Sequence, residues 1–121
     1  MSGFARMRNI VLETADPKGL AGFYRELTGW QVVDDEPDWI TLSDGGAIRL
    51  AFQEAPGYKP PTWPDESSSM QYHLDFMVDD LAEAGERAVA LGATKFAHQP
   101  GGDDFVVYAD PAGHVFCLCV N

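Results

Sequence analysis

The sequence predicts an α+β fold in which one βαβββ unit occurs twice. Residues 9–52 and residues 73–119 show the same succession of patterns: a strand, an amphipathic helix and several short strands. Asp16 and Asp80 begin the two helical patterns and lie about 64 positions apart, and the glycines that end the helices are separated by nearly the same interval. Such a duplication predicts a ligand site in the cleft between the two copies.

The first unit opens with a pattern typical of a half-buried strand. Over residues 9–14, the apolar Ile10 and Leu12 alternate with residues of the opposite face. Asp16 followed by Pro17 is a typical helix start, a capping side chain with proline at the first helical position. The helix has one apolar stripe and a glycine at its end: Leu20, Phe23, Tyr24, Leu27 and Gly29.

The second unit repeats these signals with different side chains. Asp80 and Glu83 have the spacing of a capping box at the start of a helix. The predicted apolar stripe and the terminating glycine are Leu81, Ala84, Ala88, Leu91 and Gly92.

The remaining segments of both units are short and rich in Val, Ile, Phe, Trp and Thr, with Pro, Gly and Asp between them. The predicted strands are 30–34, 38–43, 47–53, 94–97, 104–109 and 114–120. We expect residues 1–121 to form a single domain, with repeat units at about 7–53 and 71–120 and a linker at 54–70.

Composition agrees with one compact domain, since 45% of the 121 residues are hydrophobic. No apolar run approaches the roughly 18 to 20 residues of a membrane span, and the N-terminus lacks the apolar core of a secretory signal. We therefore expect a cytoplasmic protein without a membrane partner. Cys117 and Cys119 lie two positions apart on the last predicted strand, where a disulfide between them would be strained, so we expect reduced thiols.

The charge balance is strongly acidic. With 8 Lys and Arg against 19 Asp and Glu, the net charge is −11. A nucleic-acid partner is not expected, because binding to a phosphate backbone requires a basic surface. The acidity favours either solubility or the attraction of cationic ligands.

Three segments with this order and spacing resemble the vicinal oxygen chelate superfamily, which includes glyoxalase I, bleomycin-resistance proteins and extradiol dioxygenases. They are residues 16–30, residues 73–80 and residues 108–118, the last with an Asp-Pro-Ala-Gly turn into the closing strand. The resemblance covers nearly the whole chain and is greatest to small glyoxalase-like proteins of actinobacteria. It implies two βαβββ repeats that form a curved mixed sheet around a cleft, and a homodimer.

Metal-dependent members of this superfamily hold one divalent ion with a His, a second His or a Gln, and a Glu side chain on equivalent strands facing the cleft. The resemblance places these positions at Asn9, Arg49, His73 and Cys117. Only His73 is a conventional ligand, Asn9 is a weak one, and the permanent cation of Arg49 opposes metal binding. Cys117 is suited to zinc, but with His73 it supplies two ligands where zinc sites normally have three or four. We therefore expect no metal and no cofactor.

Aromatic side chains near the predicted cleft indicate a planar or hydrophobic ligand. The candidate ligand-binding residues are Asn9, Trp39, Arg49, Tyr58, Trp63, Tyr72, His73, Asp75, Phe105, Tyr108 and Cys117. Tyr58 and Trp63 belong to the long segment 54–70, which is either a plain linker or a flap over the cleft.

These features predict metal-independent binding of a hydrophobic or aromatic small molecule, with sequestration of an antibiotic or natural product as the expected role. One alternative is an enzyme, either a glyoxalase-type lyase or isomerase with an atypical metal site, or a metal-free catalyst using His73 as general base. Cys117 as a nucleophile is less favoured than a buried structural thiol. The other alternative is a ligand-sensing or structural dimeric module.

Overall fold

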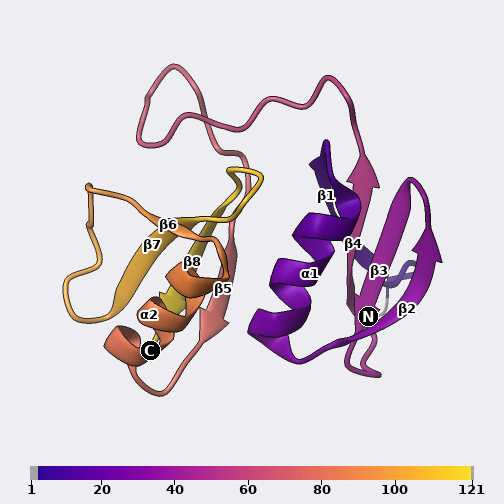
Figure 1. The fold of residues 1–121 in the computed structure, drawn as a ribbon, viewed down its shortest axis with the longest axis horizontal. Helices are drawn as coiled ribbons and strands as arrows, with labels where there is room; N and C mark the ends of the chain where they lie inside the picture. Colours follow the sequence, from indigo (N-terminus) through magenta and orange to yellow (C-terminus); the bar gives the residue numbers. More distant parts are fainter. Residues whose placement is uncertain (1–2, 121) are drawn as a thin grey trace. The chain divides into compact units, whose positions relative to one another are not determined.

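The computed structural model describes residues 3–120 and divides the chain into two compact units, with the boundary between Tyr58 and Lys59 (Figure 1). Each unit contains one helix and one four-stranded sheet in the order βαβββ. The predicted α+β fold with a repeated βαβββ unit is therefore confirmed. The unit boundary falls inside the predicted linker.

The first unit consists of β1 (Asn9–Thr14), α1 (Pro17–Thr28), β2 (Gln31–Glu36), β3 (Trp39–Ser43) and β4 (Arg49–Glu54). Its strands lie in the order β1-β4-β3-β2, and the sheet is mixed because β1 pairs with β4 in parallel while the other pairs are antiparallel. The strands agree with the predicted segments to within two residues at each end.

Helix α1 begins and ends as the sequence predicts. The Asp16 side chain accepts a hydrogen bond from the Gly19 N–H at 3.0 Å, and Gly29 adopts the left-handed conformation with φ 74°. The buried Tyr24 ring stacks on Phe52 of β4 at a centroid distance of 5.6 Å. Since strand side chains alternate between faces, α1 covers the Phe52 face, and Arg49 lies on the opposite, helix-free face.

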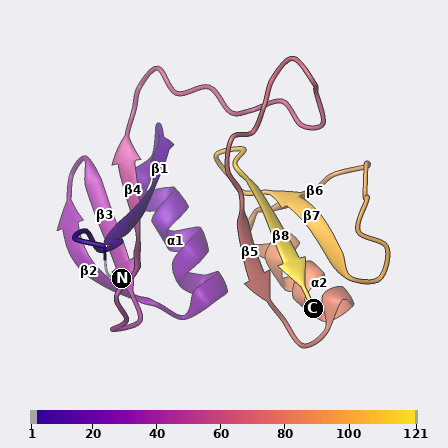
Figure 2. The same ribbon diagram turned by 180° about the vertical axis from the view of Figure 1, so that it is seen from behind.

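The second unit consists of β5 (Leu74–Met77), α2 (Leu81–Leu91), β6 (Thr94–Lys95), β7 (Phe105–Ala109) and β8 (Val115–Cys119) (Figure 2). The strand order is β5-β8-β7-β6, with β5 and β8 parallel. The predicted strand 94–97 is too long, since β6 ends at Lys95. Beyond Lys95 the Gln99 side chain hydrogen-bonds to the Phe96 and Val107 carbonyls and to the Val107 N–H.

Helix α2 confirms the predicted cap but packs differently from the predicted stripe. The Asp80 side chain accepts from the Glu83 N–H at 3.0 Å. Leu91 is 39% exposed, whereas Gly85 is buried against Tyr108 of β7. The helix approaches the sheet closely at Gly85, where a Cβ atom would overlap the Tyr108 hydroxyl. The predicted stripe was wrong at Leu91. The buried face includes Gly85 instead, and a glycine gives no apolar signal in the sequence.

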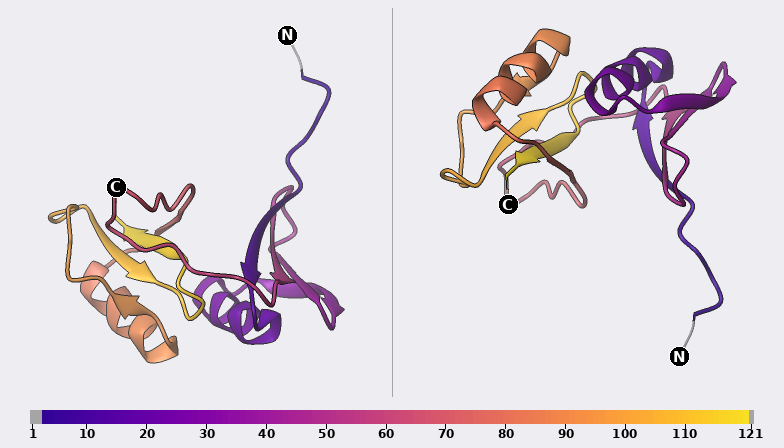
Figure 3. Two further views of the ribbon diagram at one scale, coloured as in Figure 1. Left: turned by 90° about the horizontal axis from the view of Figure 1, so that it is seen from above. Right: turned by 90° about the horizontal axis from the view of Figure 1, so that it is seen from below.

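Segments without helix or strand flank the first unit. Residues 3–8 lead away from β1 as an extended segment (Figure 3), and residues 55–73 connect β4 to β5. Neither helix in the described part of the chain combines the length and the apolar character that crossing a bilayer requires.

Candidate functional site

The helix-free face of the second sheet contains a cluster of buried apolar side chains. Along β8, Phe116 packs toward Tyr108 and α2, so the alternate residues Cys117 and Cys119 face the other way. The cluster, called here the Cys117 cluster, consists of Val107, Val115, Cys117 and Cys119. Both cysteines are free thiols, as predicted.

Three polar side chains meet at the edge of this cluster. Asp75 of β5 is directly opposite Cys117 of β8 in the parallel pairing, and His73 immediately precedes β5. The Nε2 atom of His73 lies 3.2 Å from Oδ1 of Asp75. One nitrogen, one carboxylate oxygen and the Sγ atom of these residues all lie within 4.8 Å of one another. We call them the His–Asp–Cys set.

The members of the His–Asp–Cys set differ in exposure. The side chains of His73 and Asp75 are 41% and 62% exposed, whereas Cys117 is buried. Burial, reinforced by the negative charge of Asp75, raises the pKa of the Cys117 thiol to about 12. Burial also raises the pKa of Cys119. Cys117 is therefore a protonated thiol at neutral pH and not an activated nucleophile.

The segment between the units contributes to the second unit's core. Trp63 packs against the Cys117 cluster, together with Met70, Phe96 and Phe105. The Trp63 and Phe96 rings meet edge to face with centroids 4.9 Å apart, and the His98 ring lies 5.4 Å from the indole. The structure thus brings the predicted site residues Trp63, Phe105 and Cys117 together, with Trp63 docked on the sheet of its own unit.

In the first unit, two predicted site residues bind each other. Asn9 and Arg49 are opposite one another in β1 and β4, and the Arg49 Nε–H donates to Oδ1 of Asn9 at 3.1 Å. A guanidinium nitrogen of Arg49 also lies 3.9 Å from Oδ2 of Asp34 on β2. The guanidinium is therefore held beside Asn9 by two oxygen acceptors.

The strand registers show that Arg49 and Cys117 do not occupy equivalent positions in the two units. Val11 pairs with Ala51 in the first unit, and Asp75, the counterpart of Val11, pairs with Cys117 in the second. Cys117 is thus the structural counterpart of Ala51. Ala51 lies two residues after Arg49, so the residue paired with Cys117 is Asp75, which places its carboxylate beside the thiol.

The other aromatic candidates lie in different surroundings. Trp39 shares the helix-free face of the first sheet with Arg49, since Trp39 pairs with Gln53 of β4, and its indole N–H donates to Thr41 at 2.7 Å. Tyr58 is half-buried at the end of the first unit, and Tyr72 is 88% exposed.

Tyr108 lies on the opposite face of the second sheet from Cys117. Its ring stacks on Phe116 at 5.6 Å beneath α2, and burial raises the pKa of its hydroxyl. It also lines a hollow between α2 and β7 that includes Val89 and Lys95. The structure therefore separates Tyr108 from the His–Asp–Cys set, because neighbouring residues of a strand point to opposite faces.

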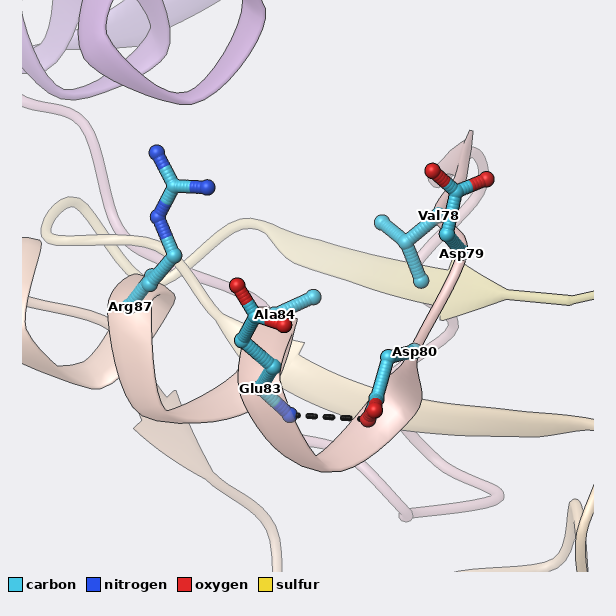
Figure 4. A pocket seen from close by; sticks show the side chains of 6 residues that line it. All are labelled: Val78, Asp79, Asp80, Glu83, Ala84 and Arg87. Carbon is cyan, nitrogen blue, oxygen red and sulfur yellow. Dashed lines mark hydrogen bonds between the residues drawn. The ribbon is translucent and has the colours of Figure 1, made fainter.

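A further hollow lies at the start of α2 (Figure 4). Its lining consists of Val78, Asp79, Asp80, Glu83, Ala84 and Arg87. Figure 4 shows Asp79 and Arg87 at opposite ends of this hollow. The hydrogen bond drawn there joins Asp80 to the Glu83 backbone, so Asp80 acts as the helix cap.

Several contacts at these positions were not predicted from the sequence. No sequence motif indicated that Asp34 lies beside Arg49 or that Thr41 lies beside Trp39. Strand alternation does place Thr41 and Trp39 on one face. Phe96 and Met70 are single apolar residues in irregular segments, and only the folded chain brings them to Cys117.

A family model described as a glyoxalase-like domain matches residues 9–119. No curated protein matches the sequence.

Solved structures share the fold. A glyoxalase/bleomycin resistance protein/dioxygenase family enzyme from Burkholderia phytofirmans PsJN is 21% identical, covers 94% of this chain and 97% of its own, and has a TM-score of 0.72. The bleomycin resistance determinant encoded on transposon Tn5 is 22% identical, with 97% and 98% covered and a TM-score of 0.61. A mutant of the fosfomycin resistance protein FosX from Listeria monocytogenes, complexed with Mn(II) and dihydroxypropylphosphonic acid, is 15% identical, with 99% and 92% covered and a TM-score of 0.74.

Proposed function

Because the chain belongs to the glyoxalase-like domain family, we propose that it binds a hydrophobic or aromatic small molecule without altering it and without a metal ion. Sequestration of an antibiotic or natural product is the role that fits this activity. The proposal includes a single functional domain formed by the whole chain.

The hydrogen bond between Arg49 and Asn9 is the observation that carries this proposal. A permanent guanidinium charge, held by Asn9 and Asp34, stands at one of the positions where the resemblance expects a metal ligand. A fixed cation at that place repels a divalent ion, and the Asn9 oxygen is already used as an acceptor. Metal-assisted chemistry of the kind seen in glyoxalase I therefore has no support in the first unit.

The aromatic side chains support an organic ligand. On the helix-free face of the first sheet, the half-buried Trp39 indole accompanies the Arg49 guanidinium and the Asn9 amide. An indole offers a flat apolar surface, and the two polar groups can orient a ligand by hydrogen bonds. This combination suits a planar molecule with a few acceptor groups.

Two of the structural neighbours represent different ligand classes. One is a bleomycin resistance determinant, and the other is the FosX mutant complexed with Mn(II) and a small phosphonic acid. The Arg49–Asn9 pair favours metal-free binding of an organic ligand over metal-assisted recognition of a phosphonate.

A thermal-shift screen tests the proposal. The purified chain is heated with bleomycin, fosfomycin and a panel of planar aromatic natural products, each with EDTA and, separately, with Mn²⁺. A bound compound at a hundred times its Kd should stabilise the protein by about 2.7 kcal/mol. We expect an aromatic compound to raise the melting temperature equally in EDTA and in Mn²⁺.

Variants locate the binding face. Trp39→Ala should weaken binding of the compound found, and Trp30→Ala is the matched control because Trp30 belongs to no candidate site. A stabilising compound that acts only with Mn²⁺, or a response confined to fosfomycin, would contradict the proposal.

A further inference from the structure

We propose that the hollow between α2 and β7 binds a small organic monocarboxylate, with Tyr108 and Lys95 as the groups that hold the carboxylate. We call it the Tyr108 hollow, and its lining includes Leu81, Glu86, Val89, Lys95, Val106 and Tyr108. The hollow lies entirely within the second unit, on the face of the sheet that α2 covers. It is separate from the proposed ligand site on the helix-free face of the first sheet.

The Tyr108 hollow exists because the edge strand of the second sheet is short. β6 contains only Thr94 and Lys95, which pair with Ala109 and Tyr108 of β7. Val106, two residues before Tyr108, faces the same side of the sheet but has no β6 residue paired with it. The space left there has a volume of about 630 Å³, within the range of roughly 300–1,000 Å³ usual for small-molecule sites.

The Tyr108 hydroxyl is a buried polar group at the wall of this hollow. Tyr108 is 3% exposed, and its hydroxyl occupies the place where a Cβ atom of Gly85 would lie. Within residues 3–120 this hydroxyl has no hydrogen-bond partner, and burial raises its pKa. Buried hydroxyls are normally hydrogen-bonded, because an unpaired one costs free energy. An acceptor group of a ligand in the hollow satisfies it, and the raised pKa keeps the hydroxyl protonated and able to donate.

Lys95 supplies a second donor beside this hydroxyl. Because Lys95 and Tyr108 are directly opposite in the antiparallel pairing, their side chains project from the same face of the sheet. In the part of the chain that the structure describes, the Lys95 ammonium group pairs with no carboxylate, although Glu86 also borders the hollow. An ammonium group and a phenolic hydroxyl can donate together to the two oxygens of a carboxylate, and such charge-assisted hydrogen bonds are strong.

The rest of the lining determines what the carboxylate is attached to. Leu81 and Val89 lie on one side of α2, and Val106 belongs to the sheet beneath them. Val89 is 50% exposed, so an apolar body that covers it removes hydrophobic surface from water. The carboxylate of Glu86 repels a second negative group on the ligand. These features select an aliphatic or aromatic monocarboxylate over a dicarboxylate or a phosphate.

Isothermal titration calorimetry of the intact chain with 2-naphthoate tests the site. We expect one molecule to bind per chain. Tyr108→Phe, which keeps the stacked ring, should lower the affinity about tenfold, and Lys95→Gln should lower it about threefold to tenfold. The neutral isostere 2-naphthamide should bind at least about tenfold more weakly. Glu86→Gln should strengthen binding about threefold, because a repelling charge is removed.

Matched controls are Tyr72→Phe and Lys59→Gln, which remove the same groups at exposed positions of the connecting segment. Both should keep the native affinity for 2-naphthoate. Absence of saturable binding at millimolar concentration, unchanged affinity in either Tyr108→Phe or Lys95→Gln, or an equal loss in the controls would overturn the proposal. Loss of 2-naphthoate binding in Trp39→Ala would also overturn it, since the ligand would then lie on the first sheet.

Thermal unfolding without ligand separates a binding role of the hydroxyl from a structural one. Tyr108→Phe should be at least as stable as the native chain, because it removes a buried hydroxyl that has no partner among the described residues. Addition of 2-naphthoate should then raise the melting temperature of the native chain more than that of Tyr108→Phe. A lower melting temperature of ligand-free Tyr108→Phe would show that the hydroxyl is bonded within the protein and would contradict the site.

Discussion

Asp75 faces Cys117 across the parallel pairing of β5 and β8, and its carboxylate adds to the burial that raises the pKa of the thiol. The register of β5 against β8 therefore affects the pKa of Cys117. The raised pKa keeps the thiol protonated in the folded protein at a pH at which an exposed cysteine has begun to ionise.

A measurable loss of stability at alkaline pH follows from that pKa. The Cys117 thiol titrates near 9 when unfolded and at about 12 when folded, so its contribution is complete below pH 9 and is lost as the pH rises toward 12. One such group lowers the unfolding free energy by up to about 1.4 kcal/mol per pH unit in that window. Urea unfolding of metal-free protein at pH 7, 9 and 10 should show a steeper decline in the native chain than in Cys117→Ala. Parallel declines would contradict the assignment.

Gly85→Ala should destabilise the protein although alanine favours helices. A Cβ at this position overlaps the hydroxyl of Tyr108, whose ring is buried and stacked on Phe116. We expect a loss of about 1–3 kcal/mol, as for other overpacked cores. Gly22→Ala is the control, because Gly22 is an exposed residue of α1 with open space around it. This substitution should raise the unfolding free energy by about 0.5–1 kcal/mol. Chemical denaturation measures both, and a stabilised Gly85→Ala would show that Tyr108 can move.

Trp63→Ala should lower stability by about 1–3 kcal/mol, because the indole packs on the Cys117 cluster and on Phe96. Tyr72→Ala is the matched control in the same connecting segment. Because the Tyr72 side chain is 88% exposed, this substitution should lower the unfolding free energy by less than about 0.5 kcal/mol. Equal stability of Trp63→Ala and the native chain would mean that the segment is a plain linker.

His73→Ala separates sequestration from catalysis. If the protein only binds, this substitution should reduce ligand affinity by no more than about 0.5–1.5 kcal/mol, the contribution of one hydrogen bond. If His73 acts as a general base paired with Asp75, the substitution should instead lower turnover by roughly a hundredfold or more. Mass spectrometry of ligand recovered from long incubations with EDTA should show it unchanged. A product made by the native chain and absent with His73→Ala would promote the enzyme alternative.

The chain should form a homodimer. In the first sheet, β2 is an edge strand with all six residues exposed, including the apolar Val32 and Val33. Unpaired strand edges with apolar side chains favour association, and a two-fold contact would cover two such edges at once. Light scattering at micromolar concentration should give twice the chain mass of 13.2 kDa. A monomer mass would refute the dimer.

The sequence by itself determined the elements and their limits wherever local chemistry sets them. Asp16 and Gly29 bound α1 because a capping carboxylate and a left-handed glycine act within one turn of backbone. The alternation in β1 likewise reported its buried face, since side chains change sides at every residue.

Only the tertiary structure decided which residues meet. Asp75 and Cys117 are far apart in the chain and become neighbours through a strand register that no local pattern encodes. Tyr108 and Val107 are adjacent in sequence, yet one packs under α2 and the other joins the Cys117 cluster. Local propensity is a property of a few consecutive residues, whereas register and packing depend on the free energy of the whole unit.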